Sequence, residues 1–207
     1  MVAGQLDGPI ECTLRSPVPL NALLQLERTQ AGAVLREADK VIIEARSTAL
    51  AVEPPAPIRL EDATAAMVSS LALDPRHPFP TCFVCGPQRQ NHDGLRIFPA
   101  MIGEKLYAAT WTPAAEFSDS RQLLLPEFLW AALDCPTGFA AGFPAAGKLV
   151  TGRLAVEQLR PVHAGKSCLL LSWPLGIEGR KHFSAACLYQ HEMPCAVARA
   201  TWIRLET

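Results

Sequence analysis

Residues 124–139 read Leu124-Leu-Pro-Glu-Phe-Leu-Trp-Ala-Ala-Leu-Asp-Cys-Pro-Thr-Gly-Phe139 and predict one buried helix. Pro126 suits the first turn, where a proline costs no intrahelical hydrogen bond. Residues 128–133 are all apolar and cover every face, which is typical of a helix inside a core. Only Glu127 and Asp134 put charges into this stretch. Their spacing corresponds to about two turns, so both acids lie on the same face of the helix.

Strands are predicted on both sides of this helix. Those after it have short connections that carry Gly or Pro, which indicates an antiparallel meander. Two further strands precede the helix, so the order is two strands, a long helix over 126–141 and four strands. This order predicts an α+β unit in which an antiparallel sheet wraps around a central helix. The predicted strands are 95–99, 105–112, 149–159, 166–175, 181–190 and 195–205.

The first 75 residues are predicted to form a β-rich extension to a domain at 76–207. Leu14-Arg15-Ser16-Pro17-Val18 is echoed by Leu159-Arg160-Pro161-Val162, and a strand, a glycine turn and a lysine follow in both places. Either the extension is a partial copy of the later unit, or two amphipathic sheets share a pattern by coincidence. Its expected elements are strands at 10–15, 22–27 and 40–50 and a helix at 60–73.

Composition narrows the classes of function. The chain has 207 residues, of which 49% are hydrophobic, so it can bury a substantial core. Its 19 basic and 20 acidic residues are spread along the chain, and we expect no nucleic-acid partner. No apolar run approaches the roughly 20 residues of a membrane span, and the first residues do not resemble a signal peptide. We therefore expect a cytoplasmic protein whose seven cysteines are reduced.

Three stretches carry a resemblance to a known family. They are Cys82-Phe-Val-Cys85-Gly86 with Gly94-Leu-Arg-Ile97, then Ala131-Ala-Leu-Asp134, and then the segment 152–165. Together the sequence over 78–205 resembles the hotdog-fold thioesterases, close to the phenylacetyl-CoA thioesterase-like group. The resemblance implies a hotdog fold and hydrolysis of an acyl-CoA or another acyl thioester, without a cofactor. It also implies a homodimer with sites between subunits, unless the extension supplies the missing half.

The sequence departs from this family at the start of the helix. The family's helix usually opens with His-Gly-Gly nine residues before its acid, but here that position holds Leu125-Pro126-Glu127. Asp134 matches the acid, whereas the groups that help polarise the thioester carbonyl are replaced. A second hypothesis is therefore a non-catalytic protein that binds acyl-CoA or lipid. A dehydratase of the same fold would need a histidine paired with an acid, and this helix has no histidine.

Asp134 and Glu127 are the candidate catalytic residues. A buried carboxylate has a raised pKa and can activate water as a general base, or it can attack the carbonyl itself. Alternatively, Asp134 bonds the backbone near Pro136, which removes an amide donor from the helix. Glu127 lies in the first turn, where the helix dipole favours a negative charge even without catalysis.

Candidate binding residues complete the sequence-based prediction. Trp130, Arg153 and Arg160 are candidates for substrate contacts, although the arginines could equally form local ion pairs. Cysteine and histidine are the ligands that zinc prefers, and a Cys-x-x-Cys pair stands between two histidines. The alternative for these thiols, and for Cys135, is core packing. The zinc candidates, a less favoured hypothesis, are His77, Cys82, Cys85 and His92.

Overall fold

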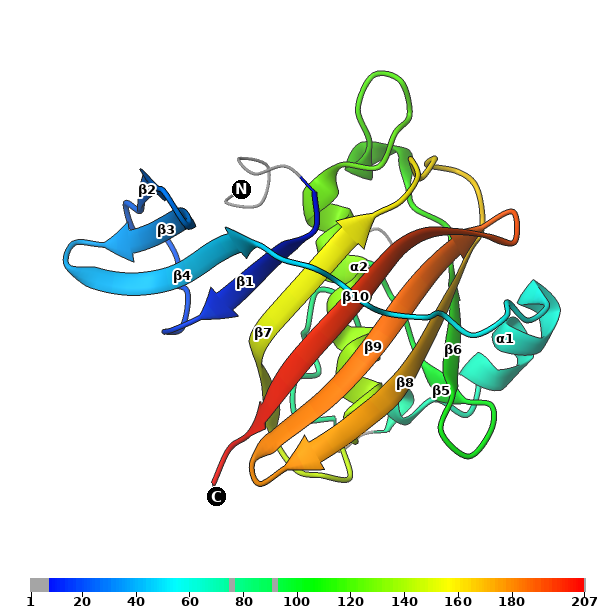
Figure 1. Ribbon diagram of the computed structural model, residues 1–207. Coiled ribbons are helices and arrows are strands. Elements are labelled where there is room, and N and C mark those ends of the chain that lie inside the picture. The colour runs from blue at the N-terminus through cyan, green and yellow to red at the C-terminus, as the bar shows by residue number, and fades with distance from the viewer. Residues whose placement is uncertain (1–7, 75–76, 91–92, 207) are drawn as a thin grey trace.

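The computed structural model describes residues 8–74, 77–90 and 93–206. One antiparallel sheet of ten strands curves over the central helix α2 (Pro126–Ala140), with strand order β2-β3-β4-β1-β7-β10-β9-β8-β6-β5 (Figure 1). A short helix, α1 (Leu60–Met67), lies beside the edge of the sheet that β5 and β6 form. The strands are β1 (Ile10–Leu14), β2 (Gln25–Thr29), β3 (Gly32–Glu37), β4 (Lys40–Ser47), β5 (Ala100–Met101), β6 (Tyr107–Trp111), β7 (Leu149–Gln158), β8 (Cys168–Glu178), β9 (Lys181–Gln190) and β10 (Met193–Arg204).

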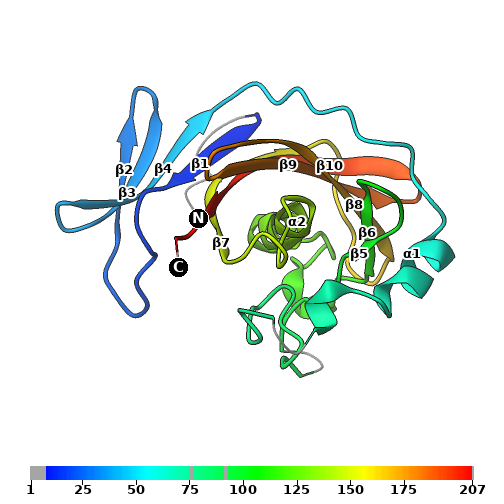
Figure 2. The same ribbon diagram turned by 90° about the horizontal axis from the view of Figure 1, so that it is seen from below.

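The predicted central helix is confirmed, and it is enclosed from two sides. The sheet arches over one side of α2, and the loops around residues 77–98 cover the other (Figure 2). Leu129, Leu133 and Phe139 are at most 1% exposed, which explains why apolar side chains occupy every face of its middle turns. Pro126 stands at the start, as expected.

The four strands after α2 are confirmed, but their arrangement as a simple meander is wrong. β8, β9 and β10 pair in sequence through tight turns, whereas β7 pairs with β10 instead of β8. The cause is the connection at 159–167, which runs across the end of the sheet. Its backbone bonds to Cys195 at the start of β10 and to Pro113 beyond β6.

The prediction also needs correction at three shorter elements. The strand expected at 95–99 is a loop, because the N–H groups of Leu95 and Ile97 bond to carbonyls at 83–84 instead of a ladder. α1 ends at Met67, and a 3-10 turn at 71–73 follows. β3 was not predicted, and its hairpin with β2 fills the region between two expected strands.

The N-terminal strands continue the same sheet as the later unit. β1 pairs with β4 on one side and with β7 on the other, with Ile10 opposite Val156. The side chain of Glu11 is 3% exposed, and both Arg46 and Arg153 contact its carboxylate. β7 is therefore not an edge strand, because β1 pairs with its outer side. The division at residue 75 and the homodimer stay predictions.

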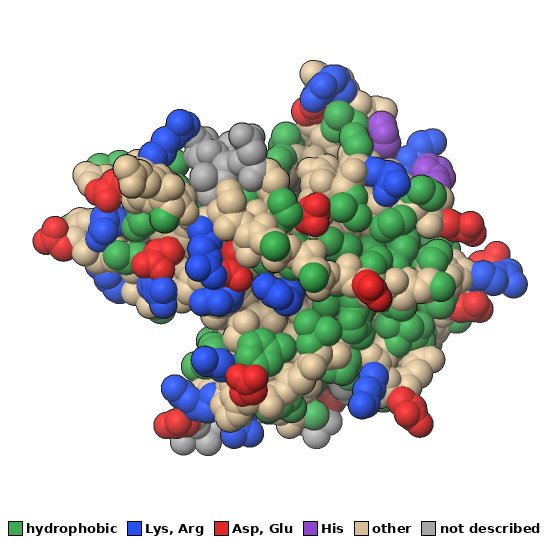
Figure 3. Space-filling view, in the orientation of Figure 1, with side chains coloured by type: hydrophobic (Ala, Val, Ile, Leu, Met, Phe, Trp, Pro, Cys, Tyr) green, Lys and Arg blue, Asp and Glu red, His purple; other side chains and the backbone are tan. Residues whose placement is uncertain are grey.

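The face of the sheet opposite α2 carries a second apolar cluster. It includes Leu169, Leu171 and Val197, against which side chains of the segment at 50–58 pack. Figure 3 shows hydrophobic side chains gathered over these strands, with cations and acids interspersed around them. Within the described residues, no helix has the length and apolar character needed to cross a membrane.

Candidate functional site

A cavity of about 580 Å³ lies between α2, the ends of β7 and β10, and the chain that follows β1. Its wall is mostly apolar, and it includes the acid that the sequence singles out, Asp134. The N-terminal strands help to build it, because residues 14–17 form part of the wall. The lining residues fall into five groups: 14–17; Phe79, Cys82 and Cys85; Asp134, Cys135, Gly138, Phe139 and Phe143; 149–152; and Trp202, Ile203 and Leu205.

Asp134 is held by a hydrogen bond from the sheet. The hydroxyl of Thr151 on β7 donates to Oδ1 of Asp134 over 2.8 Å. Burial raises the pKa of Asp134 to about 6, although the Thr151 hydrogen bond acts in the opposite direction. The alternative that this carboxylate satisfies the backbone near Pro136 does not hold. There, the Thr137 hydroxyl donates instead to the backbone carbonyl of Asp134.

A glycine one turn after Asp134 sets the contact between α2 and the sheet. A Cβ atom on Gly138 would lie 2.9 Å from the indole ring of Trp202 on β10, closer than real contacts allow. Trp202 therefore packs directly on the helix backbone, and its Nε1 donates to the Thr137 hydroxyl over 2.9 Å. This packing brings the end of β10 against the same face of α2 that carries Asp134.

Three cysteines from two separate segments meet at the cavity wall. The sulfur atoms of Cys82, Cys85 and Cys135 all lie within 4.8 Å of one another, and those of Cys82 and Cys135 are 3.5 Å apart. Hydrogen bonds from the neighbouring thiols and from backbone N–H groups lower the pKa of Cys82. Nε2 of His77 lies 3.5 Å from the Cys85 sulfur. His92, the fourth predicted zinc candidate, lies outside the described residues.

Cys135 is the member of this cluster that is not among the zinc candidates predicted from the sequence. Its position next to Asp134 gives no hint of the other thiols, because Cys82 lies 53 positions earlier in the chain. The contact arises because the loop over 77–98 covers α2. A third sulfur near a Cys-x-x-Cys pair can therefore be found only from the tertiary structure.

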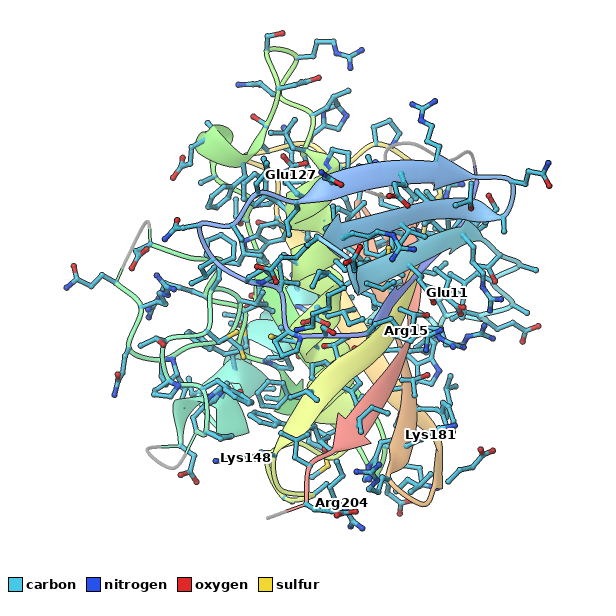
Figure 4. The ribbon with its side chains drawn as sticks, turned by 90° about the vertical axis from the view of Figure 1, so that its left-hand side faces the viewer. Glu11, Arg15, Glu127, Lys148, Lys181 and Arg204 are labelled. Atoms are coloured by element: carbon cyan, nitrogen blue, oxygen red, sulfur yellow. The ribbon has the colours of Figure 1, made fainter. Side chains whose placement is uncertain are left out.

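The other predicted site residues lie apart from Asp134. Glu127 is exposed on the first turn of α2, toward the opposite end of the molecule from Lys148 and Arg204 (Figure 4). The side chain of Trp130 packs against the cluster around β1 and β3. Arg153 contacts Glu11 and Thr13, and Arg160 donates to the carbonyl of Pro194. The lining of the cavity includes none of these four residues.

Cations that the sequence analysis did not select lie near the cavity. Arg15 is part of the wall and pairs with Glu44 over 2.6 Å. Lys148 and Arg204 each precede a lining residue, and both are exposed. Arg204 is two residues beyond Trp202, so it projects to the α2 side of β10. Figure 4 shows Lys148 and Arg204 at the same end of the molecule, near the ends of β7 and β10.

Comparisons with known proteins bear on the fold. No protein-family model matches the sequence, and no curated protein matches it. Among solved structures, a thioesterase superfamily protein matches with a TM-score of 0.50 at 14% identity, over 56% of this chain and 62% of the other. This chain has a hotdog-like fold. The structural part of the family resemblance is therefore confirmed.

Two further matches have lower TM-scores. The Escherichia coli PaaI protein from the phenylacetic acid degradation operon matches with a TM-score of 0.47 at 16% identity, over 52% of this chain and 82% of the other. A thioesterase superfamily protein from Shewanella loihica matches with a TM-score of 0.46 at 19% identity, over 53% and 91%. The N-terminal β region of this chain lies outside the half that matches these structures.

Proposed function

We propose that this hotdog protein hydrolyses an acyl thioester, with Asp134 as its catalytic acid–base residue. The observation that carries the proposal is the position of Asp134. Its carboxylate lies at the wall of an apolar cavity, where a hydrogen bond from Thr151 orients it. An apolar cavity of about 580 Å³ suits an acyl group, and such pockets use a few polar groups for orientation.

In the proposed reaction, Asp134 accepts a proton from a water molecule as the water oxygen attacks the thioester carbonyl carbon. The tetrahedral intermediate then collapses, the carbon–sulfur bond breaks, and the protonated Asp134 returns the proton to the leaving thiolate. The products are a carboxylic acid and a free thiol. The carboxylate is regenerated, so no other reactant than water is consumed.

The substrate class we propose is an acyl-CoA. Lys148 and Arg204 are exposed cations beside lining residues, on the same end of the molecule. Phosphate groups are recognised by such side chains through charge-assisted hydrogen bonds. The acyl part would enter the apolar cavity while the phosphates of the CoA part stay at the surface. Arg153 and Arg160, the arginines that the sequence suggested, are engaged elsewhere.

The test is hydrolysis of a panel of short, long and aromatic acyl-CoAs by the wild type and by Asp134→Asn. The amide keeps the shape and an acceptor for Thr151 but cannot take up the proton, so we expect kcat to fall by about 10²- to 10⁴-fold. Glu127→Gln is the matched control: it removes a carboxylate from the same helix at an exposed position, and kcat should stay within about twofold.

Three results would contradict the proposal. Equal activity of Asp134→Asn and the wild type would remove Asp134 from the chemistry, and loss of activity in Glu127→Gln would favour the acid at the start of the helix. If the panel is bound but not turned over, the alternative of a non-catalytic binding protein is correct. The replacement of His-Gly-Gly by Leu125-Pro126-Glu127 favours that alternative.

A further inference from the structure

The cluster of three thiols at the cavity wall has no part in the proposed hydrolysis. We propose that Cys82, Cys85 and Cys135 bind one Zn²⁺ ion as three thiolate ligands. This inference stands apart from the proposed function, because it concerns the binding of a metal and not the turnover of a substrate.

The distances fit a tetrahedral ion. A Zn–S bond of about 2.3 Å places two sulfur ligands of a tetrahedral site about 3.8 Å apart. The sulfurs of Cys82 and Cys135 are 3.5 Å apart, and all three lie within 4.8 Å of one another. Small adjustments of the side chains would therefore complete the site. A disulfide would join only two of the three sulfurs, whereas one metal ion can bind all three.

A tight turn brings Cys82 and Cys85 together. The N–H of Gly86 donates to the carbonyl of Cys82 over 2.9 Å, which closes a tight turn around the pair. A Cβ atom at Gly86 would lie 2.5 Å from the backbone of Cys82, so the turn requires glycine. This turn holds the two thiols of the Cys-x-x-Cys pair close together.

His77 supports the cluster from outside it. The N–H of Phe79 donates to Nδ1 of His77 over 3.1 Å, so Nδ1 is an acceptor and the hydrogen of the neutral ring is on Nε2. Nε2 then donates to the Cys85 sulfur. A histidine that binds a metal through Nε2 would need its hydrogen on Nδ1. His77 is therefore assigned as a hydrogen-bond donor to Cys85 and not as a ligand.

Three protein ligands leave one position of a tetrahedral ion open. All three cysteines line the cavity, so this position would face it, as in zinc sites that keep a place for water or a substrate group. Two of these ligands, Cys82 and Cys85, are also zinc candidates by sequence, where the other two candidates are His77 and His92 instead of Cys135.

The test is the metal content of the full-length protein, measured by elemental mass spectrometry after dialysis against metal-free buffer. We expect about one zinc per chain in the wild type and less than about 0.1 in Cys82→Ser and Cys135→Ser. Cys187→Ser is the matched control, because Cys187 is also buried but belongs to the cluster on the opposite face of the sheet. It should keep its zinc. His77→Ala should keep it as well, and loss there would overturn the assignment of His77.

A second measurement uses only the wild type, so it tests the site even if the cysteine variants fail to fold. The wild type is stripped with a chelator and titrated with Co²⁺, and we expect thiolate-to-cobalt charge-transfer absorption that saturates at about one equivalent. Absence of both zinc and this absorption would overturn the proposal. A Cys82–Cys135 disulfide, found by mass spectrometry after purification without a reducing agent, would also overturn it. Zinc retained in Cys135→Ser at the wild-type level would overturn it too. All these readouts are independent of thioester hydrolysis.

Discussion

Thr151 is the residue through which the sheet acts on the candidate catalytic acid. Its hydroxyl is 2.8 Å from Oδ1 of Asp134, and it comes from β7 while the acid comes from α2. A carboxylate with one fixed oxygen presents the other in a defined direction. At this scale, the site depends on a hydrogen bond between elements and not on either residue alone.

Thr151→Val tests this dependence. The substitution keeps the shape of the side chain but removes the donor, so we expect kcat for acyl-thioester hydrolysis to fall about tenfold, which corresponds to one charge-assisted hydrogen bond of about 1.5 kcal/mol. Thr151→Ser keeps the hydroxyl and should restore most of the activity. Steady-state kinetics of both variants measures the effect. An equal loss of kcat in both would contradict a role for the hydroxyl.

β1 is the element that joins the N-terminal strands to the hotdog unit. Its ladder with β7 spans four residue pairs, from Ile10 opposite Val156 to Thr13 opposite Arg153. Glu11 lies on this short strand with a nearly inaccessible side chain, and it accepts two hydrogen bonds from Arg46, at 3.0 and 2.7 Å. Arg153, a predicted substrate contact, approaches the same oxygen to 3.6 Å. The attachment of the extension therefore depends on a buried acid as well as on the backbone ladder.

Glu11→Ala should lower the free energy of unfolding by about 2 kcal/mol, because it removes charge-assisted hydrogen bonds at a buried position. Glu27→Ala is the matched control on β2, where the ion pair with Arg36 is largely exposed and should contribute less than about 1 kcal/mol. Chemical denaturation followed by tryptophan fluorescence measures both. A larger effect of the control than of Glu11→Ala would contradict this account.

At the scale of the whole molecule, the cavity is a joint product of both parts of the chain. Residues 14–17 close it from one side, and β7, β10 and α2 form the rest. The family that the sequence resembles is expected to place its sites between two subunits, and here the N-terminal strands already contribute to one. Whether the chain also forms a homodimer is a prediction that its mass in solution, measured by light scattering, will test.

The cations at the cavity end give a prediction at the same scale. The double variant Lys148→Ala with Arg204→Ala should raise KM for an acyl-CoA about fivefold, since each exposed contact contributes about 0.5 kcal/mol. KM for the same acyl group on a short, uncharged thiol should not change. Lys181→Ala is the matched control. Lys181 is exposed and precedes His182, whose ring bonds to Ala141 after α2, so Lys181 projects to the opposite face.

The outcome for this double variant is also sensitive to salt. Raising the ionic strength screens exposed charges, so the difference between the double variant and the wild type should shrink. An equal increase of KM for the uncharged thioester, or an effect of Lys181→Ala as large as that of the double variant, would show that these two cations do not recognise the CoA part.

Local sequence patterns determined the central helix, the four strands after it and the choice of Asp134. These features depend on periodicity: the apolar run at 128–133 requires burial wherever the helix packs, and an acid beside it is conspicuous. The hotdog-like arrangement followed from the order of the elements and from three short motifs. The order of β7 and β10 did not follow, because strand pairing depends on how the connection at 159–167 crosses the sheet.

Only the tertiary structure decided which side chains meet. Cys135 joins Cys82 and Cys85 because a distant loop covers α2, and Thr151 meets Asp134 because β7 lies at a particular register beside the helix. Glu127 and Arg153 were both candidate site residues by sequence. In the structure, Glu127 is exposed at the start of α2, and Arg153 lies beside the buried acid Glu11. The physical reason is that periodicity fixes the buried face of an element, while contacts between elements depend on packing across the whole chain.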